Sequence, residues 1–83
     1  MDRCVVRIKF YDDREEEDLD IPLDISAIDL IIALNEIYSL GYDLNRINEY
    51  GIKMENPICL MKGTKPIYEY GVMNGSIINI TEM

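Results

Sequence analysis

Few side chains in this 83-residue chain are suited to catalysis or metal binding. The sequence contains no histidine, which excludes histidine-based acid–base catalysis, Ser/Cys–His catalysis and histidine-ligated metal sites. The two cysteines, Cys4 and Cys59, have no Cys-x-x-Cys spacing, and two thiols cannot hold a four-cysteine iron–sulfur cluster. We expect both thiols to be reduced and largely buried. The sequence therefore predicts no enzymatic activity, no cofactor and no metal site.

An acidic segment, residues 12–18 (DDREEED), supplies carboxylates that could in principle bind calcium. It lacks the alternating ligand spacing and the central glycine of an EF-hand loop. This pattern favours a solvated turn between two strands. The functional alternative is electrostatic steering of a basic partner.

The charge balance limits the classes of partner. The formal net charge is −8 and the pI is about 4.3, so the chain repels phosphate backbones and anionic lipids. We therefore expect protein partners and no nucleic acid. No apolar run approaches the roughly 20 residues of a membrane span, and the N-terminal residues lack a signal-peptide core. These features predict a cytoplasmic protein without membrane insertion, with one domain over residues 1–83.

The first third of the chain has the pattern of a hairpin. Residues 4–10 and residues 18–23 each alternate apolar and polar side chains, which is typical of half-buried strands. Pro22 suits the end of an edge strand, because it has no backbone N–H to donate. We expect Lys9 to lie across from Asp18 or Asp20 on the outer face.

Residues 26–40 have the pattern of a helix. Ser26 is the expected N-cap and Gly41 the expected C-terminal stop. A helical period places six apolar residues on one face, which we expect to be buried: Ala27, Leu30, Ile31, Leu34, Ile37 and Tyr38. Ile28 and Ile32 fall on the polar flank, where they are covered by a loop or form a contact patch for a partner.

The second half of the chain predicts further short strands. Residues 50–55 alternate, Asn56-Pro57 indicates a turn, and residues 58–61 form a short apolar stretch. Residues 67–72 indicate a one-turn connector before a last strand at 76–81. With the helix between the second and third strands, we expect an α+β fold with a mixed four- to five-stranded sheet. One helix packs across that sheet, and the last strand lies beside the first, which is the β-grasp arrangement.

The segments "GIKMENP", "IYEYGV" and "NGSIINI" resemble ubiquitin-like β-grasp proteins. Within that superfamily, "DLDIPLDISAIDLIIAL", "IKMENP" and "YEYGVMNGSIINI" resemble the YukD/EsaB group, over essentially the whole chain. Ser76 stands where that group has an acidic residue. The resemblance implies a cytoplasmic accessory or regulatory component of a type VII secretion system in Gram-positive bacteria. The resemblance also implies that this component would dock onto a larger secretion protein, such as the cytoplasmic part of a membrane ATPase or scaffold.

The resemblance also implies which residues bind a partner. The positions that match ubiquitin's receptor-binding patch are Lys53, Asn79 and Thr81, which would make that patch cationic and polar. Ile28 and Ile32 are the second candidate surface. The resemblance further implies that the Tyr70 hydroxyl holds the adjoining loop. We expect a monomer or a weak homodimer.

Two alternatives remain open. Ubiquitin-type modifiers and sulfur carriers act through a C-terminal Gly-Gly, whereas no two of the five glycines in this sequence are adjacent, so we expect no conjugation. The other alternative is a β-grasp adaptor of a different pathway, similar to Ras-binding domains, that uses residues 12–18 against a basic partner.

Overall fold

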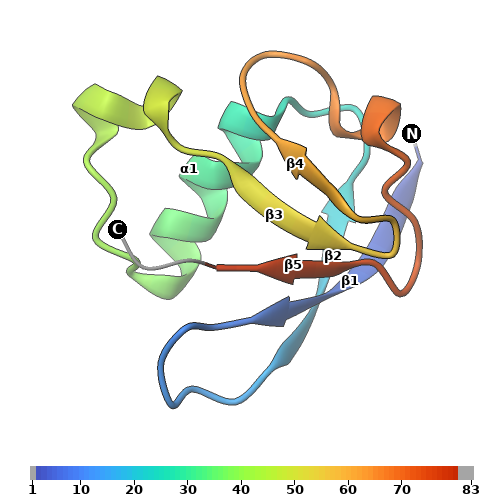
Figure 1. Cartoon of the computed structure of the whole chain (residues 1–83), viewed down its shortest axis with the longest axis horizontal. Coiled ribbons are helices and arrows are strands. Elements are labelled where there is room, and N and C mark those ends of the chain that lie inside the picture. The colour runs from blue at the N-terminus through green and yellow to red at the C-terminus, as the bar shows by residue number, and fades with distance from the viewer. Residues whose placement is uncertain (1, 81–83) are drawn as a thin grey trace.

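The computed structural model describes residues 2–80, which form a five-stranded sheet crossed on one face by the α-helix α1 (Figure 1). The elements follow in the order β1 (Arg3–Lys9), β2 (Glu17–Pro22), α1 (Ala27–Tyr38), η1 (Leu44–Glu49), β3 (Ile52–Glu55), β4 (Cys59–Met61), η2 (Ile67–Tyr70) and β5 (Ile77–Asn79), where η1 and η2 are 3-10 helices. The strand order is β2-β1-β5-β3-β4. β5 runs parallel to β1, and the other neighbouring pairs are antiparallel. This confirms the predicted α+β fold and mixed sheet, with the last strand beside the first.

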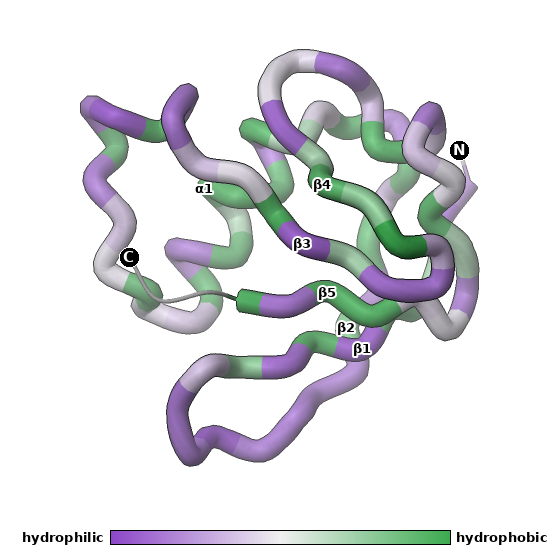
Figure 2. Tube along the Cα trace, in the orientation of Figure 1, coloured by the Kyte–Doolittle hydropathy of each residue, from purple (hydrophilic) through white to green (hydrophobic). Residues whose placement is uncertain are grey.

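The sheet has one buried and one exposed face because its strands alternate apolar and polar side chains. In β1, Cys4, Val6 and Ile8 are buried, and the residues between them are exposed. Figure 2 shows hydrophobic and hydrophilic residues alternating along β3, whereas β4 is hydrophobic throughout. Each large aliphatic side chain buried beneath α1 contributes about 1.5–3 kcal/mol before entropy is subtracted. The core comprises Cys4, Val6, Ile8, Ile21, Ala27, Leu30, Ile31, Leu34, Leu40, Ile52, Met54, Met61, Ile67, Val72, Ile78 and Ile80.

The helix begins where the sequence predicts. Ser26 has extended backbone angles, and its Oγ accepts a hydrogen bond from the Asp29 backbone N–H at 3.1 Å. This bond satisfies one of the N–H groups that have no partner within the helix. The predicted N-cap is confirmed.

The helix ends earlier than predicted. Ser39, not Gly41, is the left-handed residue after the last turn, with φ 53°. The next backbone N–H, from Leu40, donates to the Asn35 carbonyl oxygen at 3.3 Å, as in a Schellman motif. This early end turns Leu40 into the core, where it is buried. Gly41 is also left-handed, but it lies in the connection that follows the motif.

One of the six residues predicted for the buried helix face is exposed. Ala27, Leu30, Ile31 and Leu34 are buried, and Tyr38 is half-buried. Ile37, at the flank of this face in the last turn, is 55% exposed. Its burial was predicted wrongly.

The predicted register of the hairpin is also wrong. Arg7 lies opposite Asp18, and Val5 lies opposite Asp20. Lys9 extends beyond the last β1–β2 pair and lies beside Asn79 of β5 instead. Asp18 and Asp20 of β2 pair instead with Arg7 and Arg3 of β1.

The loop between β4 and η2 is held by Tyr70, as predicted. The Tyr70 hydroxyl donates to the carbonyl oxygen of Lys62 at 3.0 Å and accepts from the Lys62 backbone N–H at 3.4 Å. No helix within residues 2–80 is long and apolar enough to cross a membrane.

Candidate functional site

Four side chains form a row across the outer face of the sheet, the face opposite α1. Asn79 of β5 pairs with Lys9 of β1 on one side and with Lys53 of β3 on the other, and Leu60 of β4 pairs with Lys53. We call Lys9, Asn79, Lys53 and Leu60 the outer-face row. Lys53 is exposed and Leu60 is 55% exposed, whereas Lys9 and Asn79 are half-buried. The row therefore presents two cations, an amide and an apolar side chain to solvent.

The lysines of this row differ from the arginines in their partners. All four arginines form ion pairs with carboxylates of the same chain: Arg3, Arg7, Arg14 and Arg46. Within residues 2–80, neither Lys9 nor Lys53 forms an ion pair. The amide of Asn79, between them, donates to the Glu55 carboxylate at 3.2 Å. The two ammonium groups can therefore bind carboxylates of a partner without breaking an ion pair within residues 2–80.

The row unites two of the predicted site residues with two that sequence analysis missed. Lys53 and Asn79 are direct neighbours, as their predicted place on one patch requires. Thr81 lies outside the residues that the structure describes. Lys9 and Leu60 were missed, although their positions in alternating segments could have placed both of them on the outer face. Lys9 was instead assigned to an ion pair with β2.

The other predicted surface, Ile28 and Ile32, lies on α1. Ile28 is half-buried, and its backbone N–H donates to the Gly63 carbonyl oxygen at 3.0 Å, so the loop after β4 lies beside this turn. Ile32 is 37% exposed. Because α1 covers the inner face of the sheet, these two residues and the outer-face row do not form one surface.

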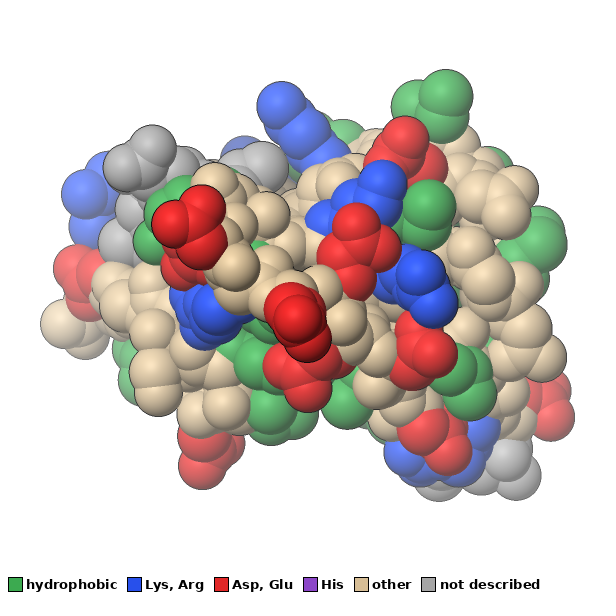
Figure 3. All heavy atoms as spheres, turned by 90° about the horizontal axis from the view of Figure 1, so that it is seen from below, with side chains coloured by type: hydrophobic (Ala, Val, Ile, Leu, Met, Phe, Trp, Pro, Cys, Tyr) green, Lys and Arg blue, Asp and Glu red, His purple; other side chains and the backbone are tan. Residues whose placement is uncertain are grey.

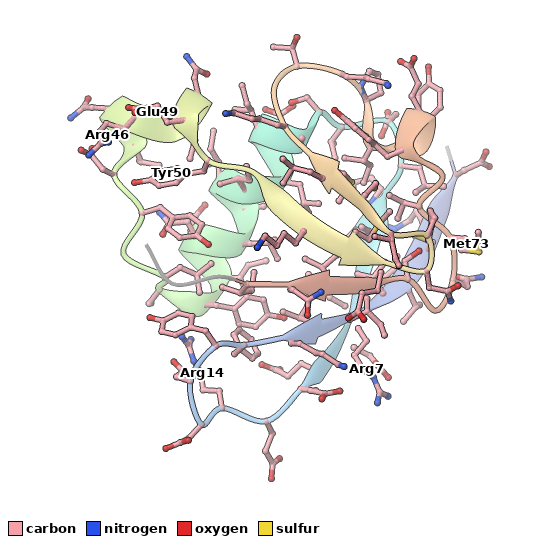
Figure 4. The ribbon with its side chains drawn as sticks, in the orientation of Figure 1. Arg7, Arg14, Arg46, Glu49, Tyr50 and Met73 are labelled. Carbon is pink, nitrogen blue, oxygen red and sulfur yellow. The ribbon has the colours of Figure 1, made fainter. Side chains whose placement is uncertain are left out.

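The outer face also carries an open hollow beside the row. Its volume is about 460 Å³, and its lining includes Val5, Arg7, Asp18 and Ile77. Val5 is 46% exposed. Figure 4 places Arg7 and Met73 near the end of the sheet that carries this hollow. An apolar side chain from a partner can enter this hollow while neighbouring groups contact the row.

The acidic segment, residues 12–18, is partly neutralised by the chain itself. Arg14 binds the Asp12 carboxylate, its Nη1 donates to the Tyr38 carbonyl oxygen at 2.7 Å, and its guanidinium lies 4.6 Å from the centre of the Phe10 ring (Figure 4). The hydrogen bond from Arg14 holds the pKa of the Asp12 carboxyl below its usual value. The segment is therefore joined to the end of α1 instead of being only solvated.

Arginines of β1 pair with three further carboxylates of the hairpin. Arg7 pairs with Asp18 at 3.2 Å and with Glu16 at 3.6 Å, and Arg3 pairs with Asp20 at 3.0 Å. Seen from below, acidic and basic side chains are interspersed over the surface (Figure 3). The face seen in Figure 3 therefore carries side chains of both charges.

The cysteines are not placed as nucleophiles. Cys4 is buried, and burial, with a smaller contribution from Asp20, raises the pKa of its thiol. Burial also raises the pKa of Cys59, although Lys65 opposes that change. A raised pKa leaves little reactive thiolate at neutral pH. Within the described residues, no group of three or more Cys, Asp or Glu side chains could hold a metal ion.

Comparison with known proteins establishes the fold. No protein-family model matches the sequence, and no curated protein is significantly similar to it. Solved structures of ubiquitin-like domains match the chain almost end to end, at sequence identities that support a shared fold alone. The chain therefore has the ubiquitin-like fold.

Three of these solved structures illustrate the degree of structural similarity. The C-terminal ubiquitin-like domain of mouse tubulin-specific chaperone e has a TM-score of 0.72 at 13% identity, covering 98% of this chain and 87% of that domain. The ubiquitin-like domain of Plasmodium falciparum Dsk2 has a TM-score of 0.62 at 17% identity, covering 95% and 99%. The ubiquitin-like domain of the Mycobacterium tuberculosis type VII secretion system protein ECCD1 has a TM-score of 0.55 at 19% identity, covering 95% and 97%.

Proposed function

We propose that this chain is a non-catalytic protein-binding module that docks through the outer face of its sheet. The observation that carries the proposal is the outer-face row, where Lys9 and Lys53 flank Asn79 and neither lysine forms an ion pair within residues 2–80. In a chain of net charge −8, two lysines on one sheet face that have no ion pair among the described residues favour a partner that offers carboxylates there.

The hollow beside the row supplies the apolar part of this surface. Ile77 and Val5 line it, and Leu60 adds an exposed apolar side chain at the other end of the face. Binding surfaces commonly combine an apolar anchor with a polar rim. The partner segment is therefore expected to carry an apolar side chain for the hollow and an acidic side chain for the row.

Our proposal also assigns the module to a pathway. We infer that it is a cytoplasmic accessory or regulatory component of a type VII secretion system in Gram-positive bacteria. Two observations support this: the sequence resembles the YukD/EsaB group, and the fold is shared with the ubiquitin-like domain of a type VII secretion protein. The partner is then a cytoplasmic part of a larger secretion component.

The docking surface is tested by site-specific photo-crosslinking in the bacterium that encodes the chain. A photoreactive amino acid at Leu60, which is exposed in the row, should crosslink to a type VII secretion component. Lys53→Glu should reduce the yield, because it replaces an attractive charge by a repulsive one. Lys62→Glu is the matched control, since it makes the same charge change at an exposed loop position. Equal yields for the two variants would contradict docking through the row.

The pathway is tested separately, by deleting the gene. The deletion should lower export of small helical-hairpin substrates or the levels of the secretion components. If both are unchanged, the assignment to secretion is wrong, whatever the crosslinking shows about the surface.

A second candidate function is an adaptor that binds a basic partner through residues 12–18. The observation that favours it is that Asp13, Glu15 and Glu17 are exposed and form no ion pair within residues 2–80. Partner binding would then weaken steeply with salt and on Glu15/Glu16/Glu17→Ala. Binding that responds to Lys53→Glu and not to this triple change favours the outer-face row.

A further inference from the structure

A second hollow lies at the end of the molecule where three distant parts of the chain meet. Its volume is about 330 Å³, and it is lined by Asp2, Leu23, Asp24 and Tyr68. These residues come from the N-terminal end, the turn between β2 and α1, and η2. Figure 1 shows the N-terminus and η2 at this same end. The hollow shares no lining residue with the outer-face row or with the hollow beside it.

Backbone hydrogen bonds fix the walls of this hollow. The Leu23 N–H donates to the Asp2 carbonyl oxygen at 3.0 Å, and the Tyr68 N–H donates to the Leu23 carbonyl oxygen at 3.1 Å. The neighbouring Ile67 N–H donates to the Ile25 carbonyl oxygen at 2.8 Å, and Ile67 itself is fully buried. The lining side chains therefore project from a framework that is already formed before any ligand binds, which lowers the entropy lost on binding.

The lining combines an aromatic ring with two carboxylates that have no partner within residues 2–80. Tyr68 is 56% exposed, and its hydroxyl forms no hydrogen bond within residues 2–80. The side chains of Asp2 and Asp24 are exposed and form neither an ion pair nor a hydrogen bond within the same residues. The other two walls are this ring and the half-buried Leu23. An aromatic face attracts a cation, and the carboxylates supply charge-assisted acceptors for it.

The rest of the chain shows the same kind of contact with its own cations. Lys65 Nζ lies 4.6 Å from the centre of the Tyr70 ring, and the Arg14 guanidinium lies 4.6 Å from that of Phe10. In each of these two pairs a cation of the chain covers an aromatic ring. The Tyr68 ring has no such cation among the described residues.

We infer that this hollow binds a lysine or arginine side chain of a protein partner. The methylene stem packs on Leu23 and the Tyr68 ring, and the charged end lies between the carboxylates of Asp2 and Asp24. This inference goes beyond the proposed function, because the outer-face row attracts carboxylates whereas this hollow attracts a cation. The two surfaces give one small module two contacts of opposite charge.

The test uses two short peptides that differ in charge and not in shape. The isotope-labelled full chain is titrated with acetyl-Gly-Arg-Gly-amide and with its citrulline counterpart, in which a neutral urea replaces the guanidinium. Salt is held at about 150 mM, where the Debye length of about 8 Å suppresses non-specific attraction to an acidic chain. We expect saturable NMR shifts at the backbone amides of Leu23, Asp24 and Tyr68 with the arginine peptide only.

Substitutions of the lining residues test which side chains contribute to binding of the arginine peptide. Tyr68→Leu and Asp24→Asn should each weaken arginine-peptide binding by about two- to fivefold. Tyr68→Phe, which keeps the ring, should retain it. Glu36→Gln is the matched control for Asp24→Asn, because it removes one negative charge at an exposed position on α1. Equal shifts with both peptides, or equal binding by Asp24→Asn and Glu36→Gln, would overturn the inference.

This outcome is separable from the proposed function. Lys53→Glu leaves the lining of the hollow intact, so its arginine-peptide shifts should match those of the unchanged chain. Loss of the peptide shifts in Lys53→Glu would also count against the inference. Failure of the crosslinking experiment at Leu60 has no bearing on it.

Discussion

Arg14 and Tyr38 join the β1–β2 loop to the end of α1: Nη1 of Arg14 donates to the Tyr38 carbonyl oxygen over 2.7 Å. The last carbonyls of a helix have no partner within it, and the C-terminus carries partial negative charge. The Arg14 guanidinium donates a hydrogen bond to one of these carbonyls and places a positive charge at the helix C-terminus. The rings of Phe10 and Tyr38 meet edge to face at 4.9 Å beside this bond. The loop is thereby fixed against the helix although its sequence is dominated by charge.

We expect Arg14→Ala to destabilise the fold measurably. The change removes a helix-capping donor, the contact with Phe10 and the partner of Asp12 together, and it should lower Tm by about 4–8 °C. Arg46→Ala is the control, because Arg46 pairs with Glu49 on the solvent side of η1 (Figure 4). Exposed pairs contribute little, so its Tm should change by less than about 2 °C. Thermal unfolding followed by circular dichroism decides, and equal shifts would contradict a capping role.

The same cluster predicts a pH dependence. The hydrogen bond from Arg14 lowers the pKa of Asp12 in the folded chain, so the ionised carboxylate stabilises the fold above its unfolded pKa of about 4. That stability is lost as the pH falls through the lowered folded-state pKa. Asp12→Asn should therefore melt below the unchanged chain near neutral pH, and the difference should vanish in acid. A Tm difference that stays constant from about pH 7 to about pH 2 would contradict this linkage.

Tyr70 and Tyr68 offer a matched pair within η2. The Tyr70 hydroxyl makes both hydrogen bonds to Lys62, whereas Tyr68 makes no hydroxyl bond within residues 2–80. Tyr70→Phe should lower the free energy of unfolding by about 0.5–1.5 kcal/mol, and Tyr68→Phe should leave it unchanged. Urea denaturation measures both. A Tyr70→Phe variant as stable as Tyr68→Phe would show that the loop does not depend on the hydroxyl.

Ser76 occupies a buried position that an acidic side chain would not suit. Its fully buried hydroxyl donates to the Asn56 carbonyl oxygen at 2.7 Å and accepts from the Met73 N–H at 3.0 Å. An ionised carboxylate accepts but cannot donate, so it would face the Asn56 carbonyl without a proton between them.

We therefore expect Ser76→Ala to cost about 1–3 kcal/mol of unfolding free energy, because it removes both hydrogen bonds, to the Met73 N–H and to the Asn56 carbonyl oxygen. Ser76→Asp should cost more, since it also buries a charge. Thr64→Ala removes an exposed hydroxyl and should stay within about 0.5 kcal/mol. Chemical denaturation of the three variants ranks them. A Ser76→Asp variant as stable as the unchanged chain would refute this explanation.

The fold could be predicted largely from local patterns. The alternation in residues 4–10 and 50–55 reflects one buried sheet face, and the Ser26 cap is specified by the residues immediately around it. The placement of Lys53 beside Asn79 was also accessible, because side-chain alternation fixes which face each residue occupies.

The features that could not be predicted from the sequence depend on small energy differences or on long-range packing. Cross-strand charge pairs differ by less than about 1 kcal/mol, so several hairpin registers looked equally good and Lys9 was given the wrong neighbour. The helix end was misplaced because Leu40 enters the core, which only the tertiary structure reveals. The bond from Arg14 to Tyr38 spans 24 residues and leaves no local signal.

The corrected position of Lys9 yields the last prediction. Lys9 and Lys53 flank Asn79 at equivalent places in the outer-face row, so both ammonium groups face the same docked segment. Lys9→Glu should therefore reduce crosslinking from Leu60 by about three- to tenfold, the same direction as we expect for Lys53→Glu. Lys62→Glu, with the same charge change on the loop after β4, should not. If Lys53→Glu lowers the yield and Lys9→Glu does not, the partner contacts only the β3–β4 side of the sheet, and the row is not one site.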